Sequence, residues 1–241
     1  MNFHEGEIIC LDKPYRMSSF GALARVRYLI SQKLGVKRMK TGHAGTLDPL
    51  ATGVLILCTG RATKRIEELQ LHTKEYTATL QLGATTASYD MEHPVNATFP
   101  TEHITRNLIE EKLQTFVGEI QQVPPAYSAC KVNGDRAYDL MRKGRDVELK
   151  PKTLRIDEIE ITSFSPELMQ MSIRVVCGKG TYIRALARDI GEALGSGAYL
   201  TALRRTRVGD VCVEDCVTLD DFPQWLDKQT IEDIITEENK I

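Results

Sequence analysis

One short segment holds the residue types that could carry chemistry. Residues 42–53 read GHAGTLDPLATG, with three glycines, one histidine and one aspartate, Asp48. Asp48 is also the only acid within residues 13–66, which contain eleven lysines and arginines. The glycines and the Asp-Pro step predict a structured loop rather than a strand. In these cationic surroundings Asp48 is expected to stay ionised, and an ionised carboxylate suits a nucleophile better than a general acid.

Three other kinds of site fit this loop less well. A phosphate-binding loop needs the pattern G-x-x-x-x-G-K followed by Ser or Thr, which is absent, and Asp48 would repel phosphate. A metal site needs more ligands than one carboxylate and one histidine. An aspartate-dependent hydrolase needs a second carboxylate near the first for acid–base work. We therefore expect no metal at this loop.

The whole chain has the composition of an ordinary globular protein. It has 241 residues, of which 42% are hydrophobic and 27% charged, and its net charge is −2. No apolar run approaches the roughly 18 to 20 residues of a membrane helix, and the acidic N-terminus does not resemble a signal peptide. Six scattered cysteines without a C-x-x-C pair predict reduced thiols. These features favour a cytoplasmic protein, and the lack of heptads makes a monomer the default expectation.

The charges are segregated along the chain. The basic segment 13–66 and the cluster Arg204, Arg205 and Arg207 contrast with residues 214–241, which hold nine acids and two lysines. A net negative charge argues against a nucleic-acid partner, but this distribution allows a basic face on an acidic protein. The alternative is that each cluster is simply a solvated surface.

Hydrophobic periodicity predicts strands and helices in a mixed order. We expect helices over 18–35, 62–69, 101–118 and 180–195, and strands over 6–14, 53–60, 75–83, 153–164 and 169–177. Caps are expected at Ser18 or Ser19, at Gly35 and at Thr181. An Asn-Gly turn is expected at 133–134, and short acidic helices from about residue 219. Without a regular strand–helix–strand alternation, the predicted fold class is α+β around a largely antiparallel sheet.

Five segments together resemble one known family. GHAGTLDPLATGVLILCTGRATK resembles the signature loop of the TruB family of tRNA pseudouridine synthases. Further blocks of that family are similar to LDKPYRMSS, KEYTATLQLGATTASYD, VPPAYSACKVNGDRAYDLMRKG and CGKGTYIRALARDIGEALGSGAYLTALRRTRVG, in the same order. The resemblance implies the pseudouridine synthase fold, with a catalytic domain over 1–215 and a short acidic tail over 216–241. About thirty residues follow the last block, too few for the RNA-binding PUA domain that many relatives carry.

The reaction that this resemblance implies is the isomerisation of uridine 55 in the T loop of tRNA to pseudouridine. The N1–C1′ bond breaks, the uracil rotates, and C5 joins C1′, without a cofactor or a metal. Asp48 would be the catalytic carboxylate, and its addition to the uracil ring, its addition to the sugar, and stabilisation of a charged sugar are all compatible with the resemblance. The uridine would have to be flipped out of the folded loop.

The resemblance also implies roles for other pocket residues. Tyr76 would stack on the uracil and lie where a proton leaves C5, and Arg184 would pair with Asp48. Tyr182 would line the same pocket. From the residues alone, Tyr76 is more simply a sheet aromatic and Arg184 a solvated helix arginine.

Three further positions match the family more loosely. His43 matches the loop histidine that fills the space left by the flipped nucleotide, although a structural histidine is the simpler interpretation. Lys13 and Leu203 match positions that support the pocket. The chain departs from the family pattern at Arg16, where the first block usually has glycine, and at Ala87.

Phosphate contacts to the tRNA T stem-loop would come from the basic clusters, and RNA binding should therefore weaken as salt rises. The candidates are Arg25, Lys37, Arg38, Lys40, Arg61, Lys64, Arg65, Arg204 and Arg205. Two alternatives use the same basic face: an RNA chaperone that needs no Asp48, and a pseudouridine synthase for a different RNA. Guide-RNA-dependent relatives carry a PUA domain, so its expected absence weighs against this chain being one of them.

Overall fold

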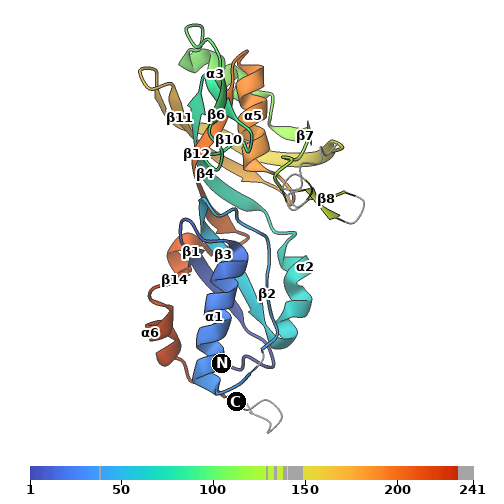
Figure 1. Cartoon of the computed structure of the whole chain (residues 1–241), viewed down its shortest axis with the longest axis vertical. Coiled ribbons are helices and arrows are strands. Elements are labelled where there is room, and N and C mark those ends of the chain that lie inside the picture. Colours follow the sequence, from blue (N-terminus) through green and yellow to red (C-terminus); the bar gives the residue numbers. More distant parts are fainter. Residues whose placement is uncertain (38, 129, 133–134, 138–139, 141–148, 233–241) are drawn as a thin grey trace. The chain divides into compact units, whose positions relative to one another are not determined.

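A computed structural model describes residues 1–37, 39–128, 130–132, 135–137, 140 and 149–232 (Figure 1). The chain divides into two compact units. The first unit combines Met1–Lys74 with Arg204–Ile241, and the second unit is Glu75–Leu203. The first unit is therefore built from both ends of the sequence. The expected Asn-Gly turn at 133–134 lies outside the described residues.

In the first unit, hydrogen-bonded strands follow one another in the order β14-β1-β3. Strand β1 runs antiparallel to β3 from Ile8↔Cys58 to Lys13↔Gly53, β2 is antiparallel to β3, and β14 is parallel to β1. The elements are β1 (Ile8–Lys13), α1 (Ser19–Leu34), β2 (Thr41–His43), β3 (Ala51–Thr59), the 3-10 helix η1 (Gly60–Arg65), α2 (Ile66–Leu69), β13 (Val211–Cys212), η2 (Val213–Asp215), β14 (Val217–Thr218) and α6 (Phe222–Asp227).

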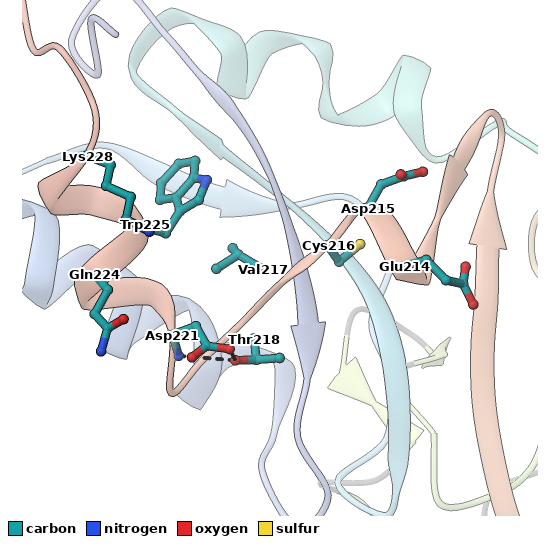
Figure 2. Close-up of a pocket in the computed structure, with 9 residues that line it drawn as sticks. All are labelled: Glu214, Asp215, Cys216, Val217, Thr218, Asp221, Gln224, Trp225 and Lys228. Atoms are coloured by element: carbon teal, nitrogen blue, oxygen red, sulfur yellow. Dashed lines mark hydrogen bonds between the residues drawn. The ribbon is translucent and has the colours of Figure 1, made fainter.

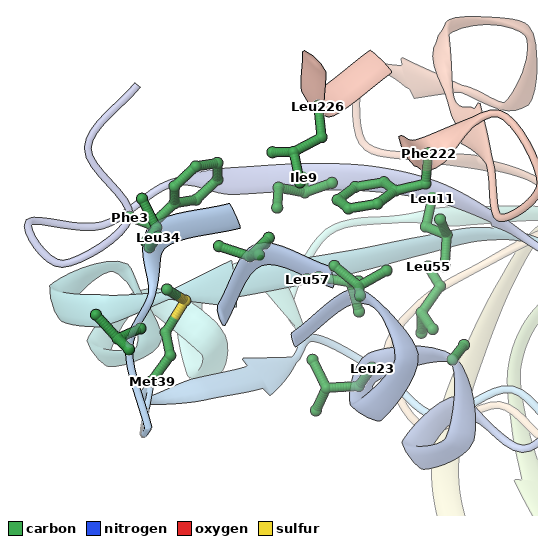
Figure 3. Close-up of a cluster of buried hydrophobic side chains, with 14 residues drawn as sticks. Phe3, Ile9, Leu11, Leu23, Leu34, Met39, Leu55, Leu57, Phe222 and Leu226 are labelled. Carbon is green, nitrogen blue, oxygen red and sulfur yellow. The ribbon is translucent and has the colours of Figure 1, made fainter. Parts of the chain in front are cut away.

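Strand β3 is buried on both faces, which explains its unbroken apolar sequence. On one face Leu55 and Leu57 join a core cluster made by β1, α1 and α6, in which Phe222 is fully buried (Figure 3). On the opposite face Val54 and Ile56 pack in a second cluster. The C-terminal segment therefore supplies part of the first unit's core through α6.

Helix α1 begins and ends where its sequence predicts. Ser18 is the N-cap and accepts a hydrogen bond from the Gly21 backbone N–H at 3.0 Å. Gly35 ends the helix with φ 65°, in the left-handed region that glycine adopts without a steric penalty. Its buried side chains, which include Val26 and Ile30, recur at helical spacing.

The second unit is built on a sheet in the order β12-β4-β11-β10-β7. Strands β10 and β11 are antiparallel, as are β10 and β7. The elements are β4 (Lys74–Leu82) from Glu75 on, β5 (Ala84–Thr86), β6 (Val95–Thr98), α3 (Arg106–Gln114), β7 (Gly118–Gln122), β8 (Lys131–Val132), β9 (Asp135–Arg136), β10 (Lys152–Ser165), β11 (Gln170–Cys177), α5 (Ile183–Ala193) and β12 (Ala198–Val208) up to Leu203. The predicted α+β class with a largely antiparallel sheet is confirmed.

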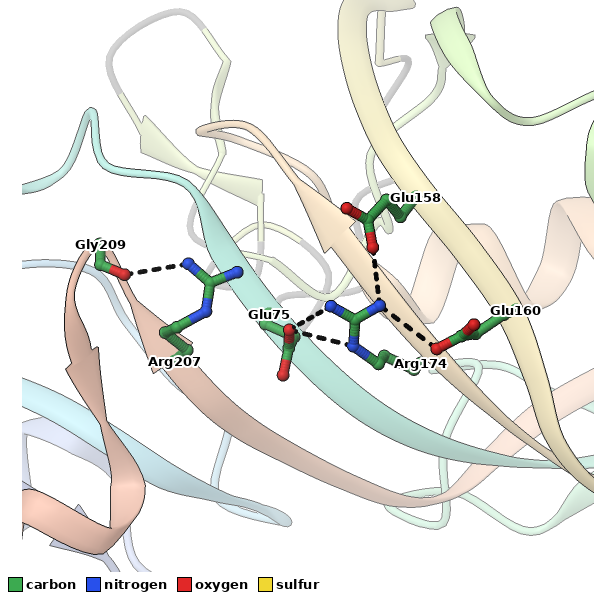
Figure 4. Close-up of polar contacts among 6 residues, drawn as sticks. All are labelled: Glu75, Glu158, Glu160, Arg174, Arg207 and Gly209. Carbon is green, nitrogen blue, oxygen red and sulfur yellow. Dashed lines mark hydrogen bonds and ion pairs between the residues drawn. The ribbon is translucent and has the colours of Figure 1, made fainter.

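An arginine on β11 forms ion pairs with carboxylates on two other strands of the second unit. Arg174 lies 2.6 Å from Glu75 of β4, 2.7 Å from Glu158 of β10 and 3.3 Å from Glu160 of β10 (Figure 4). These carboxylates raise the pKa of Arg174, so the guanidinium stays charged. These ion pairs help to hold strands β4, β11 and β10 side by side.

Some expectations about the elements were wrong. Thr181 is not the N-cap of α5: the helix begins at Ile183 after Tyr182, and the Thr181 hydroxyl donates to the Gly178 carbonyl at 3.2 Å. Residues 62–69 form a 3-10 helix followed by one short α-helix rather than one helix. Strand β12 was not predicted at all. No helix formed by the described residues is long and apolar enough to span a membrane.

Candidate active site

The loop that carries Asp48 connects two antiparallel strands. Strand β2 ends at His43 and β3 begins at Ala51, so the irregular part of the predicted loop is 44–50. The Ala44 N–H donates to the Ile56 carbonyl at 2.9 Å, and the Ala51 N–H donates to the Asp48 carbonyl at 3.1 Å. Both ends of the loop are therefore pinned to regular backbone, with Asp48 half-buried between them.

Ser19 fixes the residue immediately before Asp48. Its hydroxyl accepts from the Leu47 N–H and donates to the Leu47 carbonyl, both at 2.8 Å. Ser19 and Leu47 are 2% and 3% exposed, so these bonds are shielded from water. Because Ser18 caps α1, the side chain of Ser19 is available for this contact. From the sequence, Ser19 was expected only as an alternative cap of α1, and its contact with Leu47 was not predicted.

Lys13 lies fully buried beneath the loop. Its ammonium donates to the Met17 carbonyl at 2.6 Å, to the Pro14 carbonyl at 2.8 Å and to the Pro49 carbonyl at 3.5 Å. Burial lowers the pKa of Lys13 to about 8, against the opposing attraction of Asp48. Lys13 thus joins the turn before α1 to the residue after Asp48, while its predicted support of a pocket stays a prediction.

The prediction that Arg205 contacts RNA is wrong. Its side chain is 1% exposed, so its guanidinium is not accessible to phosphate. It donates to the Val54 carbonyl at 2.7 Å and to the Gly45 carbonyl at 3.1 Å, on the two sides of the Asp48 loop. Gly53 has φ 103°, and a Cβ there would lie 2.1 Å from the Arg205 carbonyl oxygen. The residue is a structural support for the loop.

Arg204, the neighbour of Arg205 in the sequence, points elsewhere. Its guanidinium binds both carboxylate oxygens of Asp12 at 2.7 and 3.1 Å and the Thr52 hydroxyl at 3.2 Å. The Arg204 side chain is still 40% exposed, so it remains a candidate for RNA contact. Asp12 was not predicted as the partner of Arg204, because it lies between Leu11 and Lys13 on β1 and has no distinguishing motif.

His43 at the end of β2 is half-buried, and its Nδ1 has no hydrogen-bond partner among the described residues. Burial and the positive charge of Arg205 lower the pKa of His43. The imidazole is therefore neutral at pH 7, which suits contact with an uncharged base more than with a phosphate.

Arg184 on α5 of the second unit is buried and is not a solvated helix arginine. It donates to the Tyr127 carbonyl at 2.9 Å and to the Ser88 carbonyl at 3.1 Å, and lies 3.8 Å from the Asp90 carboxylate. These contacts fix the guanidinium in one orientation. Its pairing with Asp48 stays a prediction.

The other predicted pocket residues of the second unit are only partly accessible. Tyr76 lies on the buried face of β4 and is 8% exposed. The backbone of Tyr182 binds the Gln122 side chain through bonds of 3.0 and 3.2 Å, while Tyr182 and Leu203 are half-buried. Asp48, Lys13 and His43 belong to the first unit, whereas Tyr76, Tyr182, Arg184 and Leu203 belong to the second. Their assembly into one pocket stays a prediction.

The remaining candidate RNA-binding cations are exposed on the first unit, namely Arg25, Lys37, Lys40, Arg61, Lys64 and Arg65. Arg38 lies outside the described residues. Lys40, Arg61 and Lys64 line a cavity of 250 Å³ with Phe3 and Met39. A cavity of 380 Å³ on the C-terminal segment is instead lined by Glu214, Asp215 and Asp221 together with Trp225 (Figure 2). Its carboxylates would repel phosphate, so we do not assign it to RNA.

Comparison with known proteins identifies the family. The model of the TruB family pseudouridylate synthase N-terminal domain matches residues 31–183, and that of the tRNA pseudouridylate synthase B C-terminal domain matches residues 184–237. The chain belongs to the TruB family. The tRNA pseudouridine synthase B of Phocaeicola vulgatus is 66% identical over 98% of this chain and 100% of its own length. That of Flavobacterium johnsoniae is 49% identical over 92% of this chain and 96% of its own length.

The solved structures agree with this family assignment. A chain in the crystal structure of a Cbf5-Nop10-Gar1 complex matches with a TM-score of 0.69 and 30% identity. The match covers 94% of this TruB-family chain but only 56% of that chain. The fold described above is therefore shared with a chain of that solved complex.

Proposed function

We propose that the chain isomerises uridine 55 in the T loop of tRNA to pseudouridine, with Asp48 as the catalytic carboxylate. The observation that carries the proposal is the construction of the Asp48 loop. Three buried polar side chains, Lys13, Ser19 and Arg205, bind its backbone from three different segments. Because the backbone on both sides of Asp48 is held in this way, its carboxylate projects from a fixed position, as one reaction geometry requires. Curated relatives that match over their full length carry the name tRNA pseudouridine synthase B.

The reaction balances without any added group. The N1–C1′ bond breaks and leaves its electron pair on the uracil, C1′ becomes electron-deficient, and C5 then bonds to C1′. The proton on C5 leaves, and N1 carries a proton in the product. Because no electrons are gained or lost overall, the isomerisation requires no redox cofactor. The Asp48 carboxylate supplies negative charge where positive charge develops on the sugar, or a transient covalent bond.

The other pocket residues have roles that follow from their chemistry. Tyr76 offers a ring on which the uracil stacks and a phenol near the C5 proton. Arg184 pairs with Asp48, and its fixed fork of donors orients the carboxylate. The neutral His43 occupies the space that the flipped uridine leaves. Tyr182 and Leu203 line the pocket, and Lys13 supports the loop from below.

Substrate binding would rest on the exposed cations of the first unit. Extrusion of the uridine costs a few kcal/mol of stacking, which phosphate contacts must offset. We propose that the chain acts as a monomer in the cytoplasm and needs no guide RNA. The full-length match to the tRNA pseudouridine synthase B of Phocaeicola vulgatus supports tRNA as the substrate.

The test is conversion of an unmodified tRNA T-arm stem-loop by the purified protein, with Asp48→Asn as the matched variant and filter binding at two salt concentrations. We expect conversion by the wild type only, equal binding by both proteins, and weaker binding at the higher salt. If the wild type binds without converting the uridine, the enzyme proposal fails for this RNA. A transcript-wide pseudouridine map would then distinguish another RNA substrate from a chaperone without chemistry.

A further inference from the structure

Arg16 occupies a backbone conformation that arginine normally avoids. The turn at 15–16 connects β1 to α1, and Arg16 in it has φ 61°. An L-residue with a side chain is strained in this left-handed region, and glycine is the usual occupant of such turn positions. Only Arg16, Tyr89 and Met169 have this conformation among the non-glycine residues that the structure describes. Strain that persists at one residue points to a role for its side chain.

The side chain of Arg16 is exposed and organised. Its guanidinium carbon lies 5.6 Å from the centroid of the Tyr15 ring, and Tyr15 is 46% exposed. This cation–π contact restrains a long side chain without neutralising its charge. Among the described residues, the structure gives Arg16 no carboxylate partner, in contrast to Arg61 and Arg65.

The turn adjoins the Asp48 loop. The Lys13 ammonium donates both to the Met17 carbonyl, one residue after Arg16, and to the Pro49 carbonyl, one residue after Asp48. Since those bonds measure 2.6 and 3.5 Å, the two carbonyl oxygens lie within about 6 Å of each other. A cation on this turn therefore stands beside the loop that holds the catalytic carboxylate.

We infer that Arg16, steadied by the Tyr15 ring, is a phosphate-binding subsite for the RNA backbone next to the reacting nucleotide. This inference rests on the proposed function, because it takes RNA as the substrate. A planar guanidinium with free donors matches a phosphate group, and the turn that carries Arg16 adjoins the Asp48 loop. The contact exists equally in the ground state and the transition state, so it contributes to binding rather than to the chemical step.

The decisive variant is Arg16→Asn, because asparagine tolerates the left-handed turn and carries no charge. We expect a Tm equal to that of the wild type or about 2 °C higher. The Kd for tRNA should rise about fivefold near 0.1 M salt, and the slope of log K against log salt should fall by about one. The kcat at saturating tRNA should stay unchanged, and Arg16→Lys should keep most of the affinity.

Two matched controls separate turn strain from charge. Met169→Asn changes another residue of positive φ, in the second unit, and should leave the Kd unchanged. Lys33→Asn removes a cation of the first unit that pairs with Asp227 and should leave the salt slope unchanged. A wild-type Kd and slope in Arg16→Asn, or equal losses in Arg16→Asn and Arg16→Lys, would overturn the inference. Because Kd is measured by filter binding, this result is independent of whether the wild type converts the RNA.

Discussion

Replacing Ser19 with alanine tests whether the position of the Asp48 loop depends on a single hydroxyl. The change removes the partner of both the N–H and the carbonyl of Leu47, and Leu47 is too deeply buried to find water instead. An unpaired buried backbone group costs about 1 to 3 kcal/mol, so the free energy of unfolding should fall by about 2 to 4 kcal/mol. Because Leu47 precedes Asp48, the carboxylate should also shift, and a displacement of about 1 Å costs roughly 100-fold in rate.

The control is the neighbouring residue. Ser18→Ala removes the N-cap of α1 and should cost about 1 kcal/mol of stability, but it touches no atom of the Asp48 loop. Urea unfolding gives the two stabilities, and single-turnover conversion of tRNA gives the two rates. We expect a large rate loss for Ser19→Ala and none for Ser18→Ala. If both variants keep the wild-type rate while losing stability, the Ser19 hydroxyl does not position Asp48.

Three further outcomes are expected. Lys13 has a pKa of about 8 when folded and about 10.5 when unfolded, so between these values the unfolded chain binds more protons and stability rises with pH. Over the same range Lys13 loses its charge beside Asp48, so kcat should fall above pH 8; a Lys13→Met enzyme that keeps this fall in its pH–rate profile would contradict the assignment. Gly53→Ala should cost about 3 kcal/mol or more in urea unfolding, because its Cβ meets the Arg205 backbone, whereas Gly35→Ala, with open space around it, should cost about 1 kcal/mol. Asp12→Asn should free the Arg204 guanidinium and strengthen RNA binding about twofold in filter assays, while unchanged affinity would show that Arg204 does not face RNA.

Local sequence signals determined much of the fold. The caps of α1, the alternation along β4 and the apolar run of β3 depend on nearby residues, so they were predictable. Strand β12 was not, because three arginines in its C-terminal half break the apolar alternation. Arg204 and Arg205 are compensated by partners far away in sequence, Asp12 and the Val54 carbonyl, which no local pattern reveals.

The missed strand also explains the error at Arg205. Adjacent residues of a strand point to opposite faces, so Arg204 and Arg205 have different environments although they look identical in a basic cluster. One binds Asp12 at a half-exposed position and the other lies in the core. Ser19 was overlooked for a related reason, since a serine at a helix start is explained by capping before any distant partner is considered. The loop around Asp48 was predictable because its glycines and its Asp-Pro step are local signals.

The assembly of the first unit from both ends of the sequence sets an order of events during synthesis. The second unit, Glu75–Leu203, is continuous and can complete its contacts while the chain is still growing. The Asp48 loop is made much earlier, but its Arg205 support and the Leu11↔Val217 pairing arrive only near the end. Such distant contacts form slowly. A nascent chain that does not yet contain Arg205 therefore carries Asp48 on a loop without this support, and the reaction proposed for Asp48 requires these later residues.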